Sequence, residues 1–541
     1  MIHPKDDHAN VPHYMESKVQ PPLSDLVPDA YWTTLPLYER INRATWADVR
    51  GILAFLMVGP LSALAAQCLM QVVLVSLTFI EYVVEHSSSA WMLLITTPTF
   101  MISVWLVLSV FLGSEASGIP RVLVAYRLVG QAATRQPRNT WDDLWNGGVF
   151  EHFLSLRIAV GKWLLHALIA IGGASAGPEG PAIQIGASIG SSLCKLTHTS
   201  FFYQRGAIVA GAASAVSALF NAPLGAIVFV IEEVAGEYEH FSMRVLTVLS
   251  VALGRAAVWG MPTANDVFLG TRGRPAELTD YFAAPIIGIL LGLLGGFFAR
   301  LLSEGAKARR RFPQTHRRFS IAFAGACGVV LVLLNLSVDG ALFGPGENIS
   351  RLFLDAAETG SFPSTVLFYG YGPLKFIATL LSCWSFVPGG AFVPGHSVGI
   401  GFGVYLCYLC PWVAKETVLV LSLVAYFSGF TQGPLNTVVI AAEITGMNLS
   451  MVPVALLTGG IAAAASKFVC PYPIYQLLAR IENQAVPSFD RRTVNATMMG
   501  AIDMEDMGES STAALTAHIE SQVVDVDDDR EDDRSIDQVV A

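Results

Sequence analysis

The stretch GPEGPAIQIGASIG at residues 177–190 decides the fold class of this chain, because it interrupts an apolar region with an acid and two Gly-Pro signals. Pro181 and the surrounding glycines predict that a helix begins here. A helix start presents unpaired N–H groups and a partial positive charge, which attract anions. Glu179 adds a removable negative charge, and an ionisable group at bilayer depth marks a functional site by default. The stretch therefore predicts a gated anion site in a membrane.

The composition is that of a polytopic, all-α membrane protein. Of 541 residues, 53% are hydrophobic and only 14% are charged, where a soluble domain carries about 25%. Several apolar runs exceed the roughly 20 residues that cross a bilayer, and the shorter ones, broken by Gly and Pro, predict partial or re-entrant helices. The runs are residues 51–81, 91–113, 157–173, 205–232, 243–259, 284–302, 319–336, 374–385, 396–412, 417–430 and 451–468.

Three regions follow from the distribution of charge. Residues 1–45 form a polar N-terminal segment, 46–484 the membrane body, and 485–541 an acidic tail. Residues 486–541 hold 14 acidic and 4 basic residues, which accounts for the whole net charge of −10. Such a composition predicts a disordered, solubilising tail, with a regulatory or partner-binding role as the alternative. The basic loop 304–318 is expected on the cytoplasmic side by the positive-inside rule.

The body contains an internal repeat, with halves at about 46–265 and 280–484. Lys162 lies 17 residues before Glu179, and Lys375 lies 17 residues before Phe392. Such repeats, interrupted by Gly and Pro at matching positions, predict a substrate site at their interface near the bilayer midplane. Chance similarity of apolar helices is the alternative, and two intramembrane lysines at equal offsets argue against it. A second pair of matching segments is related by a shift of 211 residues: FNAPLGAIVFVIE (220–232) corresponds to FTQGPLNTVVIAAE (430–443).

Four motifs in order resemble the CLC family of chloride channels and chloride/proton antiporters. They are ASGIP (116–120), GPEGP (177–181), GGAFVP (389–394) and PIYQLL (473–478). The resemblance covers nearly all of residues 46–484 and implies the CLC fold, with two inverted-topology halves and one pore per subunit of a homodimer. It also implies that chloride is bound by the helix starts and hydroxyls that these motifs supply: Ser117, Gly118, Ile119, Ala391, Phe392 and Tyr475.

The resemblance assigns roles to three glutamates. Glu179 is similar to the family's external gating glutamate, which competes for an anion position when ionised. Glu233 matches the internal proton-transfer glutamate, and Glu232 would be its neighbour near the water-filled route of proton access. The alternatives are a structural Glu179 bonded to backbone N–H groups, and an ordinary interfacial acid pair at 232–233.

These features together predict a chloride/proton antiporter, with a passive voltage- or pH-gated chloride channel of the same fold as the alternative. An enzyme is not expected, because His166 and Glu179 lack an accompanying nucleophile or metal-ligand spacing. The seven cysteines, including Cys407 and Cys410, are interpreted as packing residues, so no metal or cofactor is expected. Chloride, protons and the bilayer are the expected partners, and nucleic acid is not.

Three departures from the family motifs stand near the site: Pro178 where a basic residue is usual, Arg121 where glutamate is frequent, and Ala116 in place of glycine. They affect the expected affinity for the ion and the geometry of the inner vestibule, but not the expected fold. The body is also followed by no region large enough for paired nucleotide-sensing (CBS) domains. This favours a bacterial-type member in the inner (cell) membrane, with the tail in the cytoplasm, and a short eukaryotic member is the alternative.

Overall fold

The computed structural model describes residues 37–135, 152–197, 199, 201–235, 241–262, 274–311, 317–360, 362 and 366–484. Within these ranges the regular secondary structure is helical. One isolated antiparallel bridge joins Gly177 to Gly390. The expected all-α fold is confirmed. The acidic tail lies outside the described residues, so its predicted disorder stays a prediction.

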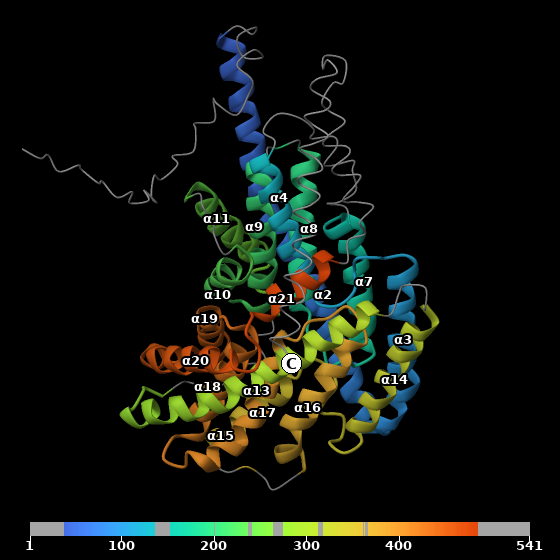
Figure 1. Ribbon diagram of the computed structural model, residues 1–541, viewed down its shortest axis with the longest axis vertical. Helices are drawn as coiled ribbons and strands as arrows, with labels where there is room; N and C mark the ends of the chain where they lie inside the picture. The colour runs from blue at the N-terminus through green and yellow to red at the C-terminus, as the bar shows by residue number, and fades with distance from the viewer. Residues whose placement is uncertain are drawn as a thin grey trace, which may run out of the picture. The chain divides into compact units, whose positions relative to one another are not determined.

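The helices follow one another in two successive sets, drawn from blue to green and from yellow-green to orange in Figure 1. The first set is α2 (Leu37–His86), the short 3-10 helix η2 (Ser89–Met92), α3 (Leu93–Ser109), α4 (Ile119–Arg135), α7 (Leu156–Ile171), α8 (Glu179–Leu196), α9 (Phe201–Phe220), α10 (Pro223–Phe229), the π-helical turn η3 (Val230–Ala235) and α11 (Phe241–Ala257). The second set is α13 (Leu278–Arg311), α14 (Arg317–Asn335), α15 (Glu347–Glu358), α16 (Val366–Trp384), α17 (Phe392–Leu409), α18 (Lys415–Thr431), α19 (Pro434–Thr445), η5 (Leu449–Met451) and α20 (Val452–Ser466), and α21 (Ile474–Gln484) follows.

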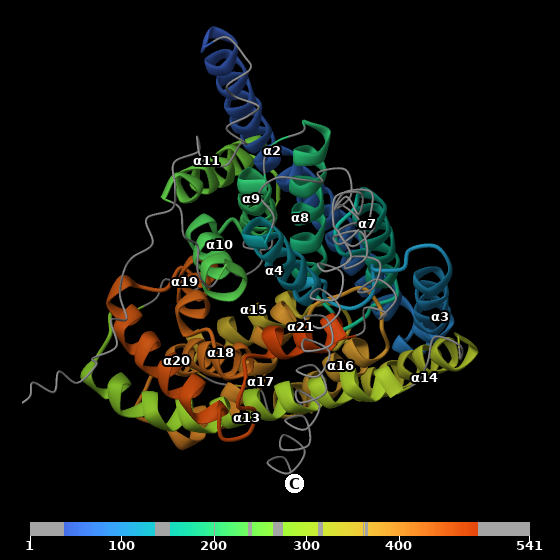
Figure 2. The same ribbon diagram turned by 45° about the horizontal axis from the view of Figure 1, so that its top comes forward.

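Corresponding helices of the two sets pack in corresponding ways. The helix that begins at Glu179, α8, packs mainly on α9, and the helix that begins at Phe392, α17, packs mainly on α18. Likewise α2 contacts α9 and α11, while α13 contacts α18 and α20. The sets meet where α10 packs on α19, and the two views of Figures 1 and 2 show these helices side by side. The repeat read from the sequence is thus a repeat of packing.

Small residues let these helices approach closely. Gly186 of α8 lies directly against the backbone carbonyl of Gly211 of α9, and a Cβ on either residue would overlap with the other's carbonyl group. In a membrane, where lipid is as apolar as leucine, such close contacts of small residues supply much of the helix association. This packing fixes the position of the α8 start, which carries Glu179.

Seven of the described helices are long and apolar enough to cross a membrane. The apolar run 205–232, in contrast, is not one span. It breaks at Asn221, whose φ is +50°, and Pro223 opens α10 at a position where its missing N–H is harmless. The second set breaks in the same way at Gln432, with φ +61°, before Pro434 opens α19.

One predicted loop differs from the structure. The predicted polar segment 1–45 stays a prediction, and α2, which begins at Leu37, contains a candidate membrane span from Val49. The basic segment 304–318 was expected as a loop, but α13 continues to Arg311 and α14 starts at Arg317. Lys and Arg are good helix formers, so a basic run does not by itself end a helix.

Candidate anion and proton site

The starts of α8 and α17 meet at a pair of glycines that correspond in the repeat. The N–H of Gly177 donates to the carbonyl of Gly390 at 2.8 Å, and the N–H of Gly390 donates back to the carbonyl of Gly177 at 2.9 Å. Each residue is therefore bonded to its own counterpart, which is the arrangement expected on a two-fold axis. The two broken helix starts meet at one point, as the repeat predicts.

Glu179 lies directly over this glycine pair. Its side chain folds back so closely that a Cβ on Gly177 would overlap with the carboxylate, and a Cβ on Gly390 would lie 3.6 Å from Oε2. Glu179 is only 1% exposed, no described side chain pairs with its carboxylate, and the nearest donors are the backbone N–H groups of Glu179 itself and of Val393 at the start of α17. A buried carboxylate that no side chain pairs with is costly in its charged form.

Neither helix start has a side-chain cap, and in this sense both starts are called open. The N-cap residues, Pro178 for α8 and Ala391 for α17, provide no side-chain cap, so the first N–H groups of each helix lack that partner. Pro178, which replaces a basic residue of the motif, has a φ of −77° that a proline ring adopts without strain. Pro178 is therefore an N-cap residue whose side chain brings neither a charge nor a hydrogen bond to the start of α8.

Ser117 approaches the same point from the loop before α4. Its Oγ has no hydrogen-bond partner among the described residues, and it lies so close to Gly180 that only glycine fits there. The following residue, Gly118, has a φ of +93°, and a side chain there would also collide with Gln184. A free hydroxyl is therefore placed beside Glu179 by two glycines.

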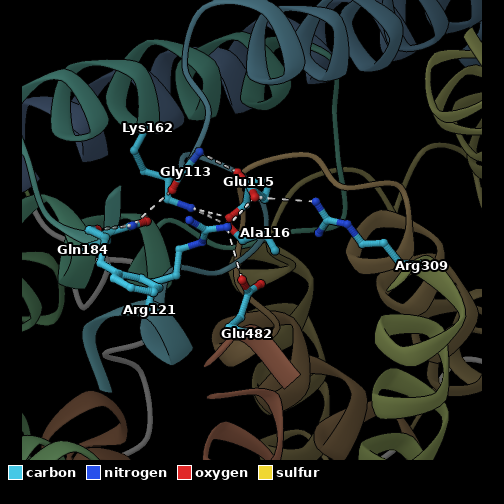
Figure 3. A network of polar contacts seen from close by, with 9 residues as sticks. Gly113, Glu115, Ala116, Arg121, Lys162, Gln184, Arg309 and Glu482 are labelled. Atoms are coloured by element: carbon cyan, nitrogen blue, oxygen red, sulfur yellow. Dashed lines mark hydrogen bonds and ion pairs between the residues drawn. The ribbon is translucent and has the colours of Figure 1, made fainter. Parts of the chain in front are cut away.

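Lys162 fixes this loop from behind. Its Nζ is fully buried and donates to the carbonyl oxygens of Glu115 at 2.9 Å and Ala116 at 2.7 Å (Figure 3). Lys375, its counterpart, donates in the same way to the carbonyls of Leu342 at 3.0 Å and Gly344 at 2.7 Å. The two intramembrane lysines thus hold the loops before α4 and α15 in the same way. This shared role explains why each lies 17 residues before its helix start, at Glu179 and Phe392.

A buried ion network joins the Ser117 loop to the helix that carries Tyr475. Glu115 pairs with Arg121 of α4 and lies 3.7 Å from Arg309 of α13, and Arg121 pairs at 3.2 Å with Glu482 of α21 (Figure 3). The unusual Arg121 and Glu115 of the sequence therefore form one ion pair. Arg309, expected in a solvent-exposed loop, reaches this network instead.

Phe392 and Tyr475 belong to one aromatic cluster. The ring of Phe392 lies 5.7 Å from that of Phe220 and 5.6 Å from that of Phe229. Phe430 lies 6.1 Å from Tyr475, which is 3% exposed. The cluster forms an apolar wall next to the open start of α17.

Glu232 and Glu233 face α19. The carboxylate of Glu232 accepts hydrogen bonds from the N–H groups of Asn436 at 2.7 Å and Leu435 at 3.4 Å, so it caps the start of α19. Glu233 is 6% exposed, and its Oε1 accepts a hydrogen bond of 3.1 Å from Nδ2 of Asn436. The adjacent acids therefore have different surroundings.

The repeat explains the glutamate that follows each Pro-Leu pair. Glu443, the counterpart of Glu232, accepts hydrogen bonds from the N–H groups of Gly225 at 2.6 Å and Leu224 at 3.2 Å at the start of α10. Each half thus caps a helix of the other half. The starts of α10 and α19 are closed by carboxylates, whereas those of α8 and α17 are open.

Sequence reasoning missed Glu347 and His396. Glu347 opens α15, is 1% exposed, and neither of its carboxylate oxygens has a hydrogen-bond partner among the described residues. The signal for Glu347 was its position directly after GPG, which repeats the glycine-bounded helix start. His396 gave a weaker signal, because a single histidine in an apolar helix has no pattern.

Comparison with known proteins agrees with this geometry. Residues 99–467 match the family described as voltage gated chloride channel. The chain belongs to this family. The matched region contains the α8 and α17 starts and both clamping lysines, and α21 with Tyr475 lies beyond it.

Curated relatives in this family include proteins named H(+)/Cl(−) exchange transporter ClcA. Those of Salmonella typhi and Salmonella typhimurium are 26% identical over 313 residues, which is 56% of this chain. The chain spans 65% of the length of these relatives.

Solved structures share the fold. A slow cyanobacterial Cl−/H+ antiporter has a TM-score of 0.66 at 20% identity, over 81% of this chain and 99% of that chain. A CLC-type fluoride/proton antiporter has a TM-score of 0.62 at 22% identity, over 80% and 97%. A eukaryotic CLC transporter also has a TM-score of 0.62, at 20% identity, over 80% and 74%. The expected CLC fold with inverted halves is confirmed.

Proposed function

We propose that this protein exchanges chloride for protons across a membrane, with Glu179 as the gate of the anion pathway. The observation that carries the proposal is the contrast between helix starts. The starts of α10 and α19 are closed by Glu443 and Glu232, while those of α8 and α17 have no side-chain cap and lie beside the Glu179 carboxyl group, which no side chain pairs with. Open N–H groups in a buried position suit an anion.

In this proposal the anion is held by uncharged donors. Ser117 supplies its free hydroxyl, and the backbone of Gly118 and Ile119 on one side and of Ala391 and Phe392 on the other supplies helix-start N–H groups. Tyr475 supplies a second hydroxyl. A site of several neutral donors binds an anion without holding it too tightly for release, which transport requires.

The ionised Glu179 occupies an anion position, and its protonated form leaves that position to chloride. Glu233 is the internal proton donor and acceptor, and Glu232 beside it is both a helix cap and a neighbour of the proton route. Exchange rather than passive conduction is supported by the presence of both acids. It is also supported by relatives named as exchangers and by similar structures described as Cl−/H+ and fluoride/proton antiporters.

The decisive test is proton movement driven by chloride. The purified protein is reconstituted in liposomes with a chloride gradient and no initial pH gradient, and both ions are followed with electrodes. An exchanger moves protons uphill until the two gradients balance, and the Glu233→Gln variant moves chloride without protons. Chloride flux with no uphill proton movement in the unmodified protein would instead establish the passive channel.

The same proposal includes a homodimer with one pore per subunit, repeat halves at about 46–265 and 280–484, and residence in a bacterial inner membrane. The basic segment 304–318 and the acidic tail face the cytoplasm. The dimer is checked by measuring the mass of the purified protein in detergent. The orientation is checked by the accessibility of single cysteines placed at 312–316 to a membrane-impermeant reagent.

A further inference from the structure

The aromatic cluster includes a histidine that has no hydrogen-bonding partner among the described residues. His396 lies on α17 and is fully buried, and neither Nδ1 nor Nε2 is hydrogen-bonded to any described residue. A buried polar atom left without a hydrogen bond destabilises the folded state. Leucine or phenylalanine would fill the same space without this cost, so the imidazole calls for a functional explanation.

On one side His396 is close to the gate. It lies one helical turn after Phe392, and the two rings are 5.1 Å apart, edge to face. Phe392 is the first residue of α17, and Gly390, two residues earlier, lies under the carboxylate of Glu179. The backbone of His396 therefore lies about one helical turn, a rise of about 5.4 Å, after the start of α17, next to which the Glu179 carboxylate lies.

On the other side two ring contacts lead towards Glu233. The Phe392 ring touches that of Phe229, which precedes Glu233 by four residues and so lies one helical turn before it. The His396 ring also lies 4.3 Å from that of Phe427, one turn before the end of α18 at Thr431. The hydroxyl of Thr431 accepts a hydrogen bond from the N–H of Gly433, and a Cβ on Gly433 would lie 2.5 Å from Oε1 of Glu233.

We propose that His396 relays protons between Glu233 and Glu179 in the exchange proposed above, on which this inference rests. The imidazole accepts on one ring nitrogen, through water, a proton that originates at the Glu233 carboxyl group, and it releases one from the other nitrogen, again through water, towards the Glu179 carboxylate. No electrons are transferred, and rotation of the ring restores the starting tautomer. The reverse order of steps moves protons inwards.

The surroundings suit a short-lived positive charge. The rings of Phe392 and Phe427 lie within reach of a cation–π interaction with the imidazolium ion. An anion bound at the nearby start of α17 would stabilise the same ion, so the proton step and the occupancy of the anion site become linked. A purely apolar cluster between the two acids would offer the proton no such intermediate position.

The test removes the imidazole and keeps either an aromatic ring or a polar side chain in its place. His396→Phe keeps an aromatic side chain among aromatic neighbours, and His396→Asn keeps polarity but cannot be protonated. Tyr426→Phe is the matched control, because its hydroxyl is another buried, unpartnered polar atom near Gly395 on the same helix pair. Chloride flux and proton flux are measured together in proteoliposomes, as in the test of the exchange itself.

A relay predicts that proton flux falls by about tenfold or more in both His396 variants, since a positioned proton-transfer group contributes at least that much. Chloride flux continues in these variants and shows that they are folded, and Tyr426→Phe keeps the unmodified chloride-to-proton ratio. An unchanged ratio in His396→Phe and His396→Asn would overturn the relay and leave the exchange intact. Absence of uphill proton movement in the unmodified protein would overturn both proposals.

Discussion

At the scale of single residues, Glu179 differs from the other buried acids in its partners. Glu115 is paired with Arg121, and Glu233 accepts a hydrogen bond from the Asn436 side chain, but no described side chain pairs with the Glu179 carboxylate. Only a group without fixed partners changes its protonation and position at low energetic cost. The same comparison makes Glu347, also unpaired, the next acid to study.

Glu179→Ala is expected to abolish proton coupling while anion flux continues, because the pathway then lacks its tethered carboxylate. The measurement is the uphill proton movement described above, with chloride efflux recorded in the same vesicles. Coupling that persists in Glu179→Ala would place the gate elsewhere.

Ser117→Pro is expected to raise the nitrate flux relative to the chloride flux. The change removes the free Ser117 hydroxyl, which is one of the proposed chloride donors. The check is the ratio of initial efflux rates for the two anions. An unaltered ratio would remove Ser117 from the selectivity site.

At the scale of elements, the molecule treats its broken helices in two ways. Glu443 of the second set caps the start of α10, and Glu232 of the first set caps the start of α19. These two caps join the sets of helices where they are in contact. The ion network of Glu115, Arg121 and Glu482 joins α4 to α21 in the same manner. These contacts hold rigid the elements that surround the open starts.

Glu232→Ala and Glu443→Ala are expected to destabilise the protein to a similar extent, by about 1 kcal/mol each, the usual loss for a removed helix cap. The apparent melting temperature in detergent measures this effect. The two variants are matched controls for function, since only Glu232 neighbours Glu233. A loss of proton flux in Glu232→Ala alone would show that Glu232 takes part in proton transfer as well as in capping. Melting temperatures equal to that of the unmodified protein would contradict the capping role.

At the scale of the whole molecule, two packed sets of helices meet at the reciprocal Gly177–Gly390 bridge, and the acidic tail follows the last described helix. Deletion of residues 485–541 is expected to leave the chloride-to-proton ratio unchanged, because the residues assigned to transport all precede it. Solubility of the purified protein is expected to fall, since the deleted segment carries the net charge of −10. A changed ratio would give the tail a regulatory role.

Much of this organisation is legible in the sequence because the chain repeats itself. Equal offsets of Lys162 and Lys375 predicted that Glu179 and Phe392 occupy corresponding helix starts, and the reciprocal bonds of Gly177 and Gly390 bear this out. The break at Asn221 was missed, because apolar residues continue through it and periodicity alone does not reveal a change of chain direction.

The sequence by itself determined the membrane class, the repeat and the CLC family, and it singled out Glu179, Glu232 and Glu233 but not Glu347, since these inferences depend on residue type and spacing. Only the tertiary structure decided which carboxylates are partnered. Glu232 caps a helix about 200 residues away, Arg309 of α13 reaches Glu115, and no described side chain pairs with Glu179 or His396. Hydrogen bonds and ion pairs join groups distant along the chain, so spacing in sequence does not show which polar groups remain free.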